Sequence, residues 1–291
     1  MNETSYQPNN LQASIHGPYQ DLFIYYLNGH VAPDYSTLGS DFLGCWQEEA
    51  SAFLFFSTAS RDHVEKMLKV RPDLTLLDEF QMTYAEWQGG KLTPLRVGRF
   101  FIAPPWHMPK NNKGAYREEL PIVLDPGVVF GTGTHPTTHD CLEALELVFR
   151  QGNPGSAIDL GTGTGLLALA ASRLGCPKIL AVDLNFLATQ TAMKNVRLNR
   201  LQDVVMVIQG RAEDFIDSPF DLVIANIHYD VMKRLIQVKG FLTPKWFILS
   251  GLLRTQARDI ACRLSKPPFR IIKKWEQDGV WHTFLGKISE S

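Results

Sequence analysis

The 291-residue sequence lacks any long apolar run. No segment approaches the roughly 20 apolar residues that span a bilayer, and the first 20 residues are polar, without the apolar stretch of a signal peptide. These absences argue against a membrane protein. We therefore expect the protein in the cytoplasm, with no membrane partner.

The sequence also has few cysteines and almost no net charge. The four cysteines, Cys45, Cys141, Cys176 and Cys262, lie far apart without metal-ligand spacing. This favours reduced thiols and no metal site, with disulfides as the less favoured alternative. The 29 Lys and Arg residues balance 30 Asp and Glu residues, for a net charge of −1. We expect no direct binding of nucleic acid, although a local basic face stays open.

A glycine-rich stretch is present at residues 157–165, which read Ala-Ile-Asp-Leu-Gly-Thr-Gly-Thr-Gly. The pattern predicts a buried strand, a loop with Gly161, Gly163 and Gly165, and the start of a helix. Such glycines adopt positive φ freely, and a helix start favours negative charge. We interpret the loop as a ligand cradle that Asp159 faces, with an ordinary strand-to-helix turn as the alternative.

Two nucleotide motifs are absent from this loop. The sixth position counted from Gly161 is Leu166, where a dinucleotide fingerprint has Gly or Ala, and no Gly-Lys-Ser/Thr follows. Asp183 ends the next predicted strand, 22 positions after Gly161. A carboxylate there can accept hydrogen bonds from both ribose hydroxyls of a nucleoside. The alternative for Asp183 is an N-cap of the following helix.

Strands and helices alternate through the second half of the chain. This alternation predicts a Rossmann-like α/β fold, in which helices cover both faces of a parallel sheet. The last two strands lack a helix between them and should form an antiparallel edge hairpin around Gln277-Asp278-Gly279. The predicted strands cover 157–160, 178–183, 204–208, 220–225, 246–250, 270–275 and 280–287, and the predicted helices cover 165–174, 186–199, 229–238 and 253–264.

The first half of the sequence predicts a small α+β domain at residues 21–86, after a mobile tail at residues 1–20. Its expected strands are 22–27, 42–47, 52–56 and 74–83, with a helix at 61–70. Gly and Pro then predict a linker at 87–120 that holds one strand, 99–102, before the main domain at 121–291.

A second constellation, Phe130-Gly-Thr-Gly-Thr-His-Pro-Thr-Thr138, precedes a predicted helix. Pro136 suits a first helical turn, and hydroxyls surround free N–H groups there. Because an ordinary cap needs fewer polar residues, we favour a ligand-facing loop that includes Thr132, His135 and Thr138.

Asn226 follows a buried strand that begins near Asp221. At the carboxyl edge of a parallel sheet its amide would point into the ligand crevice and accept from a substrate N–H. The alternative is a cap of the helix that starts near His228.

Four segments together resemble the PrmA family, bacterial methyltransferases of ribosomal protein L11. They are Leu124–Thr138, Ile158–Gly165, Ala225–Ile227 and Leu249–Leu252, and the similarity extends over roughly residues 87 to 287. The loop carries Thr162 and Thr164 where the family commonly shows Cys and Ser. Residues 1–86 resemble the family's substrate-recognition domain only in size and position.

The resemblance implies a seven-stranded methyltransferase sheet and S-adenosylmethionine as cofactor, with S-adenosylhomocysteine as product. Cofactor-binding positions carry over to Thr138, Gly161, Asp183 and Asn226, with Gly163 beside them, and we add Asp159 and Gly165 of the same loop. The acidic turn Arg211–Asp214 is either an adenine contact or an exposed charged turn.

The implied activity is methylation of amino groups, on lysine and/or the N-terminus, of a ribosomal protein of the large subunit, L11. Asn226, Thr132 and His135 are the catalytic candidates. His135 would accept the amine proton or make a structural hydrogen bond within its loop. The alternatives are methylation of another protein's lysine, a small-molecule substrate, and a cofactor-binding regulator without turnover.

Overall fold

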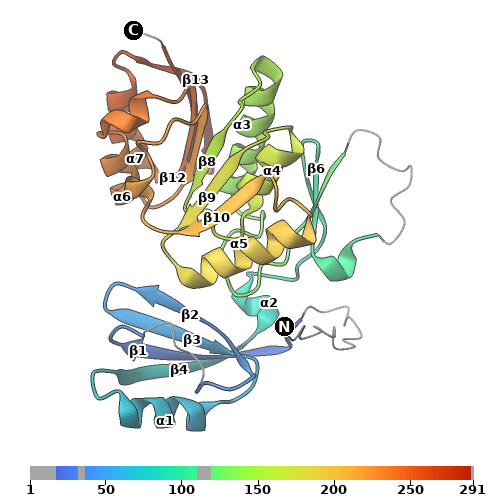
Figure 1. Cartoon of the computed structure of the whole chain (residues 1–291), viewed down its shortest axis with the longest axis vertical. Helices are drawn as coiled ribbons and strands as arrows, with labels where there is room; N and C mark the ends of the chain where they lie inside the picture. The colour runs from blue at the N-terminus through green and yellow to red at the C-terminus, as the bar shows by residue number, and fades with distance from the viewer. Residues whose placement is uncertain (1–17, 32–36, 110–118, 290–291) are drawn as a thin grey trace, which may run out of the picture.

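The computed structural model describes residues 18–31, 37–109 and 119–289. Within these ranges the chain forms two modules, drawn below and above in Figure 1. The expected mobile tail lies outside the described residues except for its last three, and so does most of the Pro109–Gly114 stretch of the expected linker.

The N-terminal module is a four-stranded antiparallel sheet with one helix. Aromatic and β-branched residues form the strands, and their order is β2-β3-β1-β4. Helix α1 lies on one face, where Val64 and Met67 pack against Leu54 and Phe56. The elements are β1 (Asp21–Asn28), β2 (Phe42–Glu48), β3 (Ser51–Phe56), α1 (Arg61–Val70) and β4 (Thr75–Thr83). All five were predicted, and all are confirmed within two residues.

The connecting segment contains more structure than the sequence predicts. After helix α2 (Tyr84–Trp87) come β5 (Leu95–Val97), β6 (Phe100–Ala103), a 3-10 turn η1 (Pro105–His107) and β7 (Leu120–Val123). Strands β5, β6 and β7 form a separate sheet, so the expectation of a single strand is wrong. Phe100, Ile102 and Ile122 of this sheet belong to the core of the larger module.

The larger module is a seven-stranded sheet in the order β10-β9-β8-β11-β12-β14-β13. The predicted alternation and edge hairpin are confirmed, and β14 is antiparallel to both β12 and β13. The strands are β8 (Ala157–Leu160), β9 (Ile179–Asp183), β10 (Val205–Gln209), β11 (Leu222–Asn226), β12 (Trp246–Leu253), β13 (Phe269–Gln277) and β14 (Trp281–Ile288).

Helices cover both faces of this sheet (Figure 1). One core joins the sheet to α3, α4 and α5, and the second joins it to α6 and α7. The helices are α3 (Pro136–Gln151), α4 (Leu166–Arg173), α5 (Phe186–Leu198), α6 (Tyr229–Leu235) and α7 (Arg254–Leu264), with 3-10 turns η2 (Ala212–Asp214) and η3 (Lys239–Leu242). The strand order reverses at β8, and ligands bind at the carboxyl ends of strands at such a point.

The two modules share a third cluster of buried side chains. Leu22, Ile24 and Phe55 of the N-terminal sheet pack with Val128 and Leu187 of the larger module. Helix α2 also donates hydrogen bonds to the loop before Val129, from the Tyr84 hydroxyl and the Gln88 amide to the carbonyl of Gly127 at 2.8 Å each. The N-terminal module is therefore seated on the larger one by both apolar and polar contacts.

Candidate functional site at the carboxyl edge of the sheet

The glycine loop between β8 and α4 is closed by backbone hydrogen bonds. Gly161, Gly163 and Gly165 have φ of +69°, +55° and +86°, which only glycine adopts readily. The N–H groups of Gly161 and Thr162 both donate to the carbonyl of Val182, at 2.8 and 3.0 Å. The loop thus folds over the ends of β8 and β9, with Gly161 exposed on top.

Asp159 lies beneath this loop. Its Oδ2 accepts from the Thr162 hydroxyl at 2.6 Å and from the Ala168 N–H at 3.2 Å, and its side chain is buried. Burial raises the pKa of Asp159 to about 6, although both hydrogen bonds lower it. The carboxylate therefore shapes the loop from below.

Asp183 ends β9 beside the same loop. Its Oδ2 accepts from the Gly163 N–H and its Oδ1 from the Asn185 N–H, both at 2.9 Å. Burial raises the pKa of Asp183, against these two hydrogen bonds. The N-cap of α5 is Asn185, whose Oδ1 accepts from the Leu187 N–H. The capping alternative for Asp183 is therefore wrong.

The threonine loop at 130–138 leads into α3. His135 is the N-cap, Pro136 is the first helical residue as predicted, and His135 Nδ1 lies 2.7 Å from the Thr137 hydroxyl. Burial lowers the pKa of His135, and nearby His139 lowers it further. Thr138 is 3% exposed, and its N–H donates to the His135 carbonyl at 2.9 Å. The structural hydrogen bond foreseen for His135 is therefore present.

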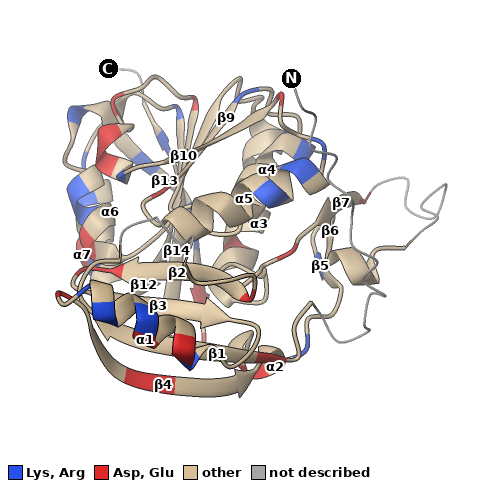
Figure 2. Cartoon of the chain, turned by 60° about the horizontal axis from the view of Figure 1, so that its bottom comes forward, with Lys and Arg blue, Asp and Glu red and all other residues tan. Residues whose placement is uncertain are grey.

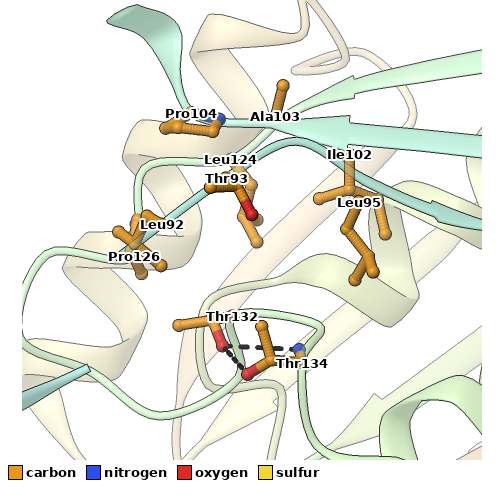
Figure 3. Close-up of a pocket in the computed structure, with 10 residues that line it drawn as sticks. All are labelled: Leu92, Thr93, Leu95, Ile102, Ala103, Pro104, Leu124, Pro126, Thr132 and Thr134. Atoms are coloured by element: carbon orange, nitrogen blue, oxygen red, sulfur yellow. Dashed lines mark hydrogen bonds between the residues drawn. The ribbon is translucent and has the colours of Figure 1, made fainter. Parts of the chain in front are cut away.

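Thr132 and Thr134 share a hydrogen bond of 2.8 Å between their hydroxyls. They form one side of a small pocket whose opposite side includes Leu95 and Ile102 of the three-stranded sheet (Figure 3). This extra sheet thus supports the threonine loop from behind.

The two loops are tied to each other. The Thr164 hydroxyl donates to the carbonyl of Gly131 at 2.7 Å, and a Cβ at Gly163 would stand 2.8 Å from the carbonyl oxygen of Phe130. Thr162 and Thr164, which differ from the residues common in the family, both use their hydroxyls inside the site. The sequence offered no signal for the bond from Thr164, because its acceptor is 33 residues away.

Asn226 lies at the end of β11, in register with Ser250 of β12. Its Nδ2 donates to the Thr137 hydroxyl at 3.3 Å, while its Oδ1 faces Gly251, where a Cβ would come within 3.0 Å. The N-cap of α6 is His228, so the capping alternative for Asn226 is wrong. The role of Thr137 toward Asn226 was missed by the sequence analysis.

The acidic turn Arg211–Asp214 contains η2. Glu213 pairs with Arg234 at 2.9 Å and with Arg211 at 3.7 Å. Burial alone would raise the pKa of Glu213, but a backbone hydrogen bond and Arg234 lower it overall. Asp214 is exposed. Glu213 is thus paired with two arginines, while the choice between an adenine contact and a charged turn stays open.

Two adjoining hollows lie in front of the threonine loop. One, of about 480 Å³, is lined by Thr132, Thr134, His135 and the α2 end. The other, of about 530 Å³, is mostly apolar and is lined by the open face of the N-terminal sheet, including Trp46 and Phe80. Trp87 and Phe130 belong to both hollows. The sequence does not predict this arrangement, because it depends on how the modules pack.

Within the described residues, no group of three His, Cys, Asp or Glu side chains could hold a metal ion, and no helix is long and apolar enough to cross a membrane. None of the four cysteines, all of which lie in the described ranges, is in a disulfide.

A mostly parallel seven-stranded sheet with an antiparallel edge hairpin, a glycine loop after β8 and an acidic residue ending β9 define the class of Rossmann-like methyltransferase domains. The family model described as ribosomal protein L11 methyltransferase (PrmA) matches residues 56–288, and the chain belongs to this family. The predicted family is confirmed. The match leaves out residues 1–55, and with them β1, β2 and most of β3.

Curated relatives carry the same description. The chain is similar to the ribosomal protein L11 methyltransferase of Anoxybacillus flavithermus, 35% identical over 67% of this chain and 61% of that protein. The counterpart from Geobacillus kaustophilus is 40% identical over 61% of this chain and 56% of its own length. The matches thus span about three fifths of these relatives.

A solved structure, the ribosomal protein L11 methylase from Lactobacillus delbrueckii subsp. bulgaricus, is 27% identical with a TM-score of 0.58. That match covers 66% of this chain and 96% of the other.

Proposed function

We propose that this protein is an S-adenosylmethionine-dependent protein N-methyltransferase that methylates amino groups of ribosomal protein L11. Family membership and the description of the relatives support this activity. The main structural support for this activity is the position of Asn226. The Asn226 amide stands at the sheet edge beside the glycine loop, with its Nδ2 held by Thr137 so that Oδ1 is left to accept a substrate N–H.

The residues present fit the proposed cofactor. The Asp183 carboxylate has about four lone-pair positions, of which backbone N–H groups occupy two. The remaining two match the paired hydroxyls of a ribose. Gly161 presents exposed backbone next to it, and Gly163, Gly165 and Thr138 complete the proposed contacts, with Asp159 holding the loop.

S-adenosylmethionine, when bound, supplies a methyl group on a sulfonium, which a neutral amine can attack in line. A lysine has a reference pKa near 10.4, so deprotonation at pH 7 costs about 4 to 5 kcal/mol. Asn226 Oδ1 accepts an amine hydrogen and aims the lone pair, and the apolar walls around Phe130 disfavour the ammonium form.

His135 and Thr132 border the same hollow. Because His135 Nδ1 accepts from the Thr137 N–H, the neutral ring carries its hydrogen on Nε2, and Nδ1 is the only ring atom with a lone pair for the amine proton. The lowered pKa of His135, caused by burial and by His139, keeps the imidazole neutral and able to accept it. The Thr132 hydroxyl, paired with Thr134, supplies a further acceptor at the rim.

The protein substrate enters along the two hollows. They have Trp87 and Phe130 in common, so the hollow on the N-terminal sheet lies next to the hollow at the threonine loop. In this proposal residues 21–86 recognise the substrate, 87–120 connect, and 121–291 carry out the transfer. The compartment is the cytoplasm, and no direct contact with nucleic acid is involved.

The test incubates the purified protein with ribosomal protein L11 and a methyl-labelled cofactor, and locates the label by mass spectrometry. Asn226→Ala should lower the turnover about a hundredfold while the cofactor affinity changes less than about threefold. Label on another protein in a substrate-depleted lysate, but not on L11, would reassign the substrate, and label on a small molecule would do the same. Cofactor binding without any acceptor would indicate a regulator.

A further inference from the structure

A buried carboxylate, Asp140, sits on α3 away from the residues just assigned. It is 1% exposed, and its two oxygens accept from the Gln277 amide at 2.7 Å and from the Thr283 hydroxyl at 2.9 Å. Both donors belong to the edge hairpin β13–β14. Burial raises the pKa of Asp140 in spite of these hydrogen bonds, so its charge is costly in the folded protein.

The hydrogen bonds continue from Thr283 toward the site. Thr283 Oγ1 lies 2.6 Å from Ser250 Oγ, and Ser250 Oγ lies 3.3 Å from the carbonyl oxygen of Thr137, to which it can donate. Thr283 and Ser250 are both fully buried. Since Thr283 gives its only hydroxyl hydrogen to ionised Asp140, the single hydrogen of Ser250 is shared between Thr283 Oγ1 at 2.6 Å and the Thr137 carbonyl at 3.3 Å, as a three-centre hydrogen bond.

Thr137 joins this chain to Asn226. Its hydroxyl accepts from Asn226 Nδ2 at 3.3 Å and lies 2.7 Å from His135 Nδ1. The first turn of α3 is therefore held between two sets of contacts. The buried hydrogen bonds of Asp140, Thr283 and Ser250 lie on one side, and two proposed catalytic side chains lie on the other.

We propose that Asp140, Thr283 and Ser250 are positioning residues, which fix the first turn of α3 and thereby orient the Asn226 amide toward the acceptor amine. This inference rests on the proposed function. Three buried polar side chains stabilise a fold less well than apolar ones of similar volume would. A fully satisfied polar network does, however, specify one arrangement.

The same helix offers a matched control. Glu143, one turn after Asp140, accepts from the Trp275 indole N–H at 2.9 Å and so also ties α3 to β13. None of the hydrogen bonds found for Glu143 in the described chain leads to Ser250 or Thr137. Loss of the bond to Trp275 should weaken the attachment of the hairpin without disturbing Asn226.

The experiment compares Thr283→Val, Thr283→Ser and Glu143→Gln. Thr283→Val removes the hydroxyl at nearly constant volume, and kcat should fall about ten- to a hundredfold, as expected for a misplaced reacting group. The Kd for S-adenosylmethionine should stay within about twofold. Thr283→Ser should restore most of kcat. Glu143→Gln replaces the charged acceptor of the Trp275 indole N–H with a neutral amide oxygen, and it should keep kcat within about twofold with a smaller loss of thermal stability than Thr283→Val.

A second readout does not need turnover. The side-chain amide resonances of Asn226, assigned with Asn226→Ala, should shift in Thr283→Val and stay in place in Thr283→Ser and Glu143→Gln. Unshifted resonances in Thr283→Val, or equal losses of kcat in Thr283→Val and Glu143→Gln, would overturn the proposal. A wild-type protein that labels no acceptor while the resonances still shift as described would refute the proposed function and leave the positioning inference standing.

Discussion

The Asp183 carboxylate accepts two backbone hydrogen bonds at 2.9 Å and has capacity for two more. Each hydrogen bond from a ribose hydroxyl to a charged group contributes about 1.5 to 3 kcal/mol. Asp183→Ala should therefore weaken S-adenosylmethionine binding more than about a hundredfold, which calorimetry would measure. Asp62→Ala on α1, an exposed carboxylate in the other module, should bind normally. Normal binding by the Asp183 variant would exclude the ribose role.

Asp159 makes stability depend on pH. Its pKa, raised by burial to about 6, exceeds the ordinary value, so the folded state holds a proton between about pH 4 and 6 that the unfolded chain has lost. The free energy of unfolding should then decrease as pH rises through this window, by about 3 kcal/mol. Asp159→Asn can still accept from Thr162 but carries no charge.

Denaturant titrations of both proteins at pH 4.5 and pH 7.5 measure this effect. The free energy of unfolding of Asp159→Asn should increase relative to that of the wild type as pH rises, because the variant has no carboxylate to ionise in its buried position. Parallel stability curves at the two pH values would show that Asp159 does not titrate as inferred.

The strand-end positions of two site residues could be predicted from the sequence, whereas two hydrogen bonds of the site could not. Asp183 and Asn226 end strands, and their capping alternatives failed because Asn185 and His228 occupy the cap positions. The bonds of Thr164 to Gly131 and of Thr137 to Asn226 could not be predicted, since they span 33 and 89 residues. Their acceptors and donors meet only after the sheet has formed.

At the scale of elements, the hydrogen bond from Thr164 to Gly131, which joins the glycine loop to the threonine loop, should affect both stability and cofactor affinity. Thr164→Val leaves the Gly131 carbonyl without its hydroxyl donor, which should lower the free energy of unfolding by about 1 to 2 kcal/mol. Because both loops border the proposed cofactor, its affinity should fall about fivefold or more. Calorimetry and chemical denaturation test the two effects.

Thr243→Val is the matched control for this change. The Thr243 hydroxyl donates to the Gly240 carbonyl at 2.8 Å, beside η3. Because Thr243 is exposed while Thr164 is fully buried, loss of this hydrogen bond should reduce stability by less, and it should leave cofactor affinity unchanged. Equal loss of affinity in both variants would mean that the effect is general destabilisation.

Element prediction succeeded where the pattern is local. The β8 and β11 strands are mostly apolar, with Asp159 as the exception in β8, and they end in a turn or a polar residue, so their limits follow from the sequence. Strands β5 and β7 are three and four residues long, which is too short for a periodicity. Both strands pair with β6, and Val97 of β5 and Ile122 of β7 are buried in the same core as α3 and α4. No local signal contains these contacts.

At the scale of the whole molecule, the apolar hollow on the N-terminal sheet should govern affinity for the protein substrate. Phe80 on β4 lines this hollow and is 41% exposed. Phe80→Glu should raise the KM for L11 about tenfold and leave the cofactor Kd unchanged, because a charge would be buried under the substrate. Steady-state kinetics with varied L11 measure the change.

Leu77, on the same strand, is 52% exposed and is not among the residues that line the hollow. Leu77→Glu should keep the wild-type KM. Charges of both signs already occur on the N-terminal module, where α1 carries basic and acidic residues and β4 carries acidic ones (Figure 2). A rise in KM for both variants would point to a general charge effect.

Asn185 belongs to both halves of the molecule. Its N–H donates to Asp183, and its side-chain amide donates to the carbonyl of Gln47 in the N-terminal module at 3.3 Å. One residue thus joins the proposed ribose contact to the N-terminal module, for which we propose substrate recognition. Where two ligands act on one such junction, the factor by which either one changes the other's affinity is the same in both directions. If the proposed cofactor and protein substrate both act on Asn185, the dissociation constant measured for either one should depend on whether the other is bound.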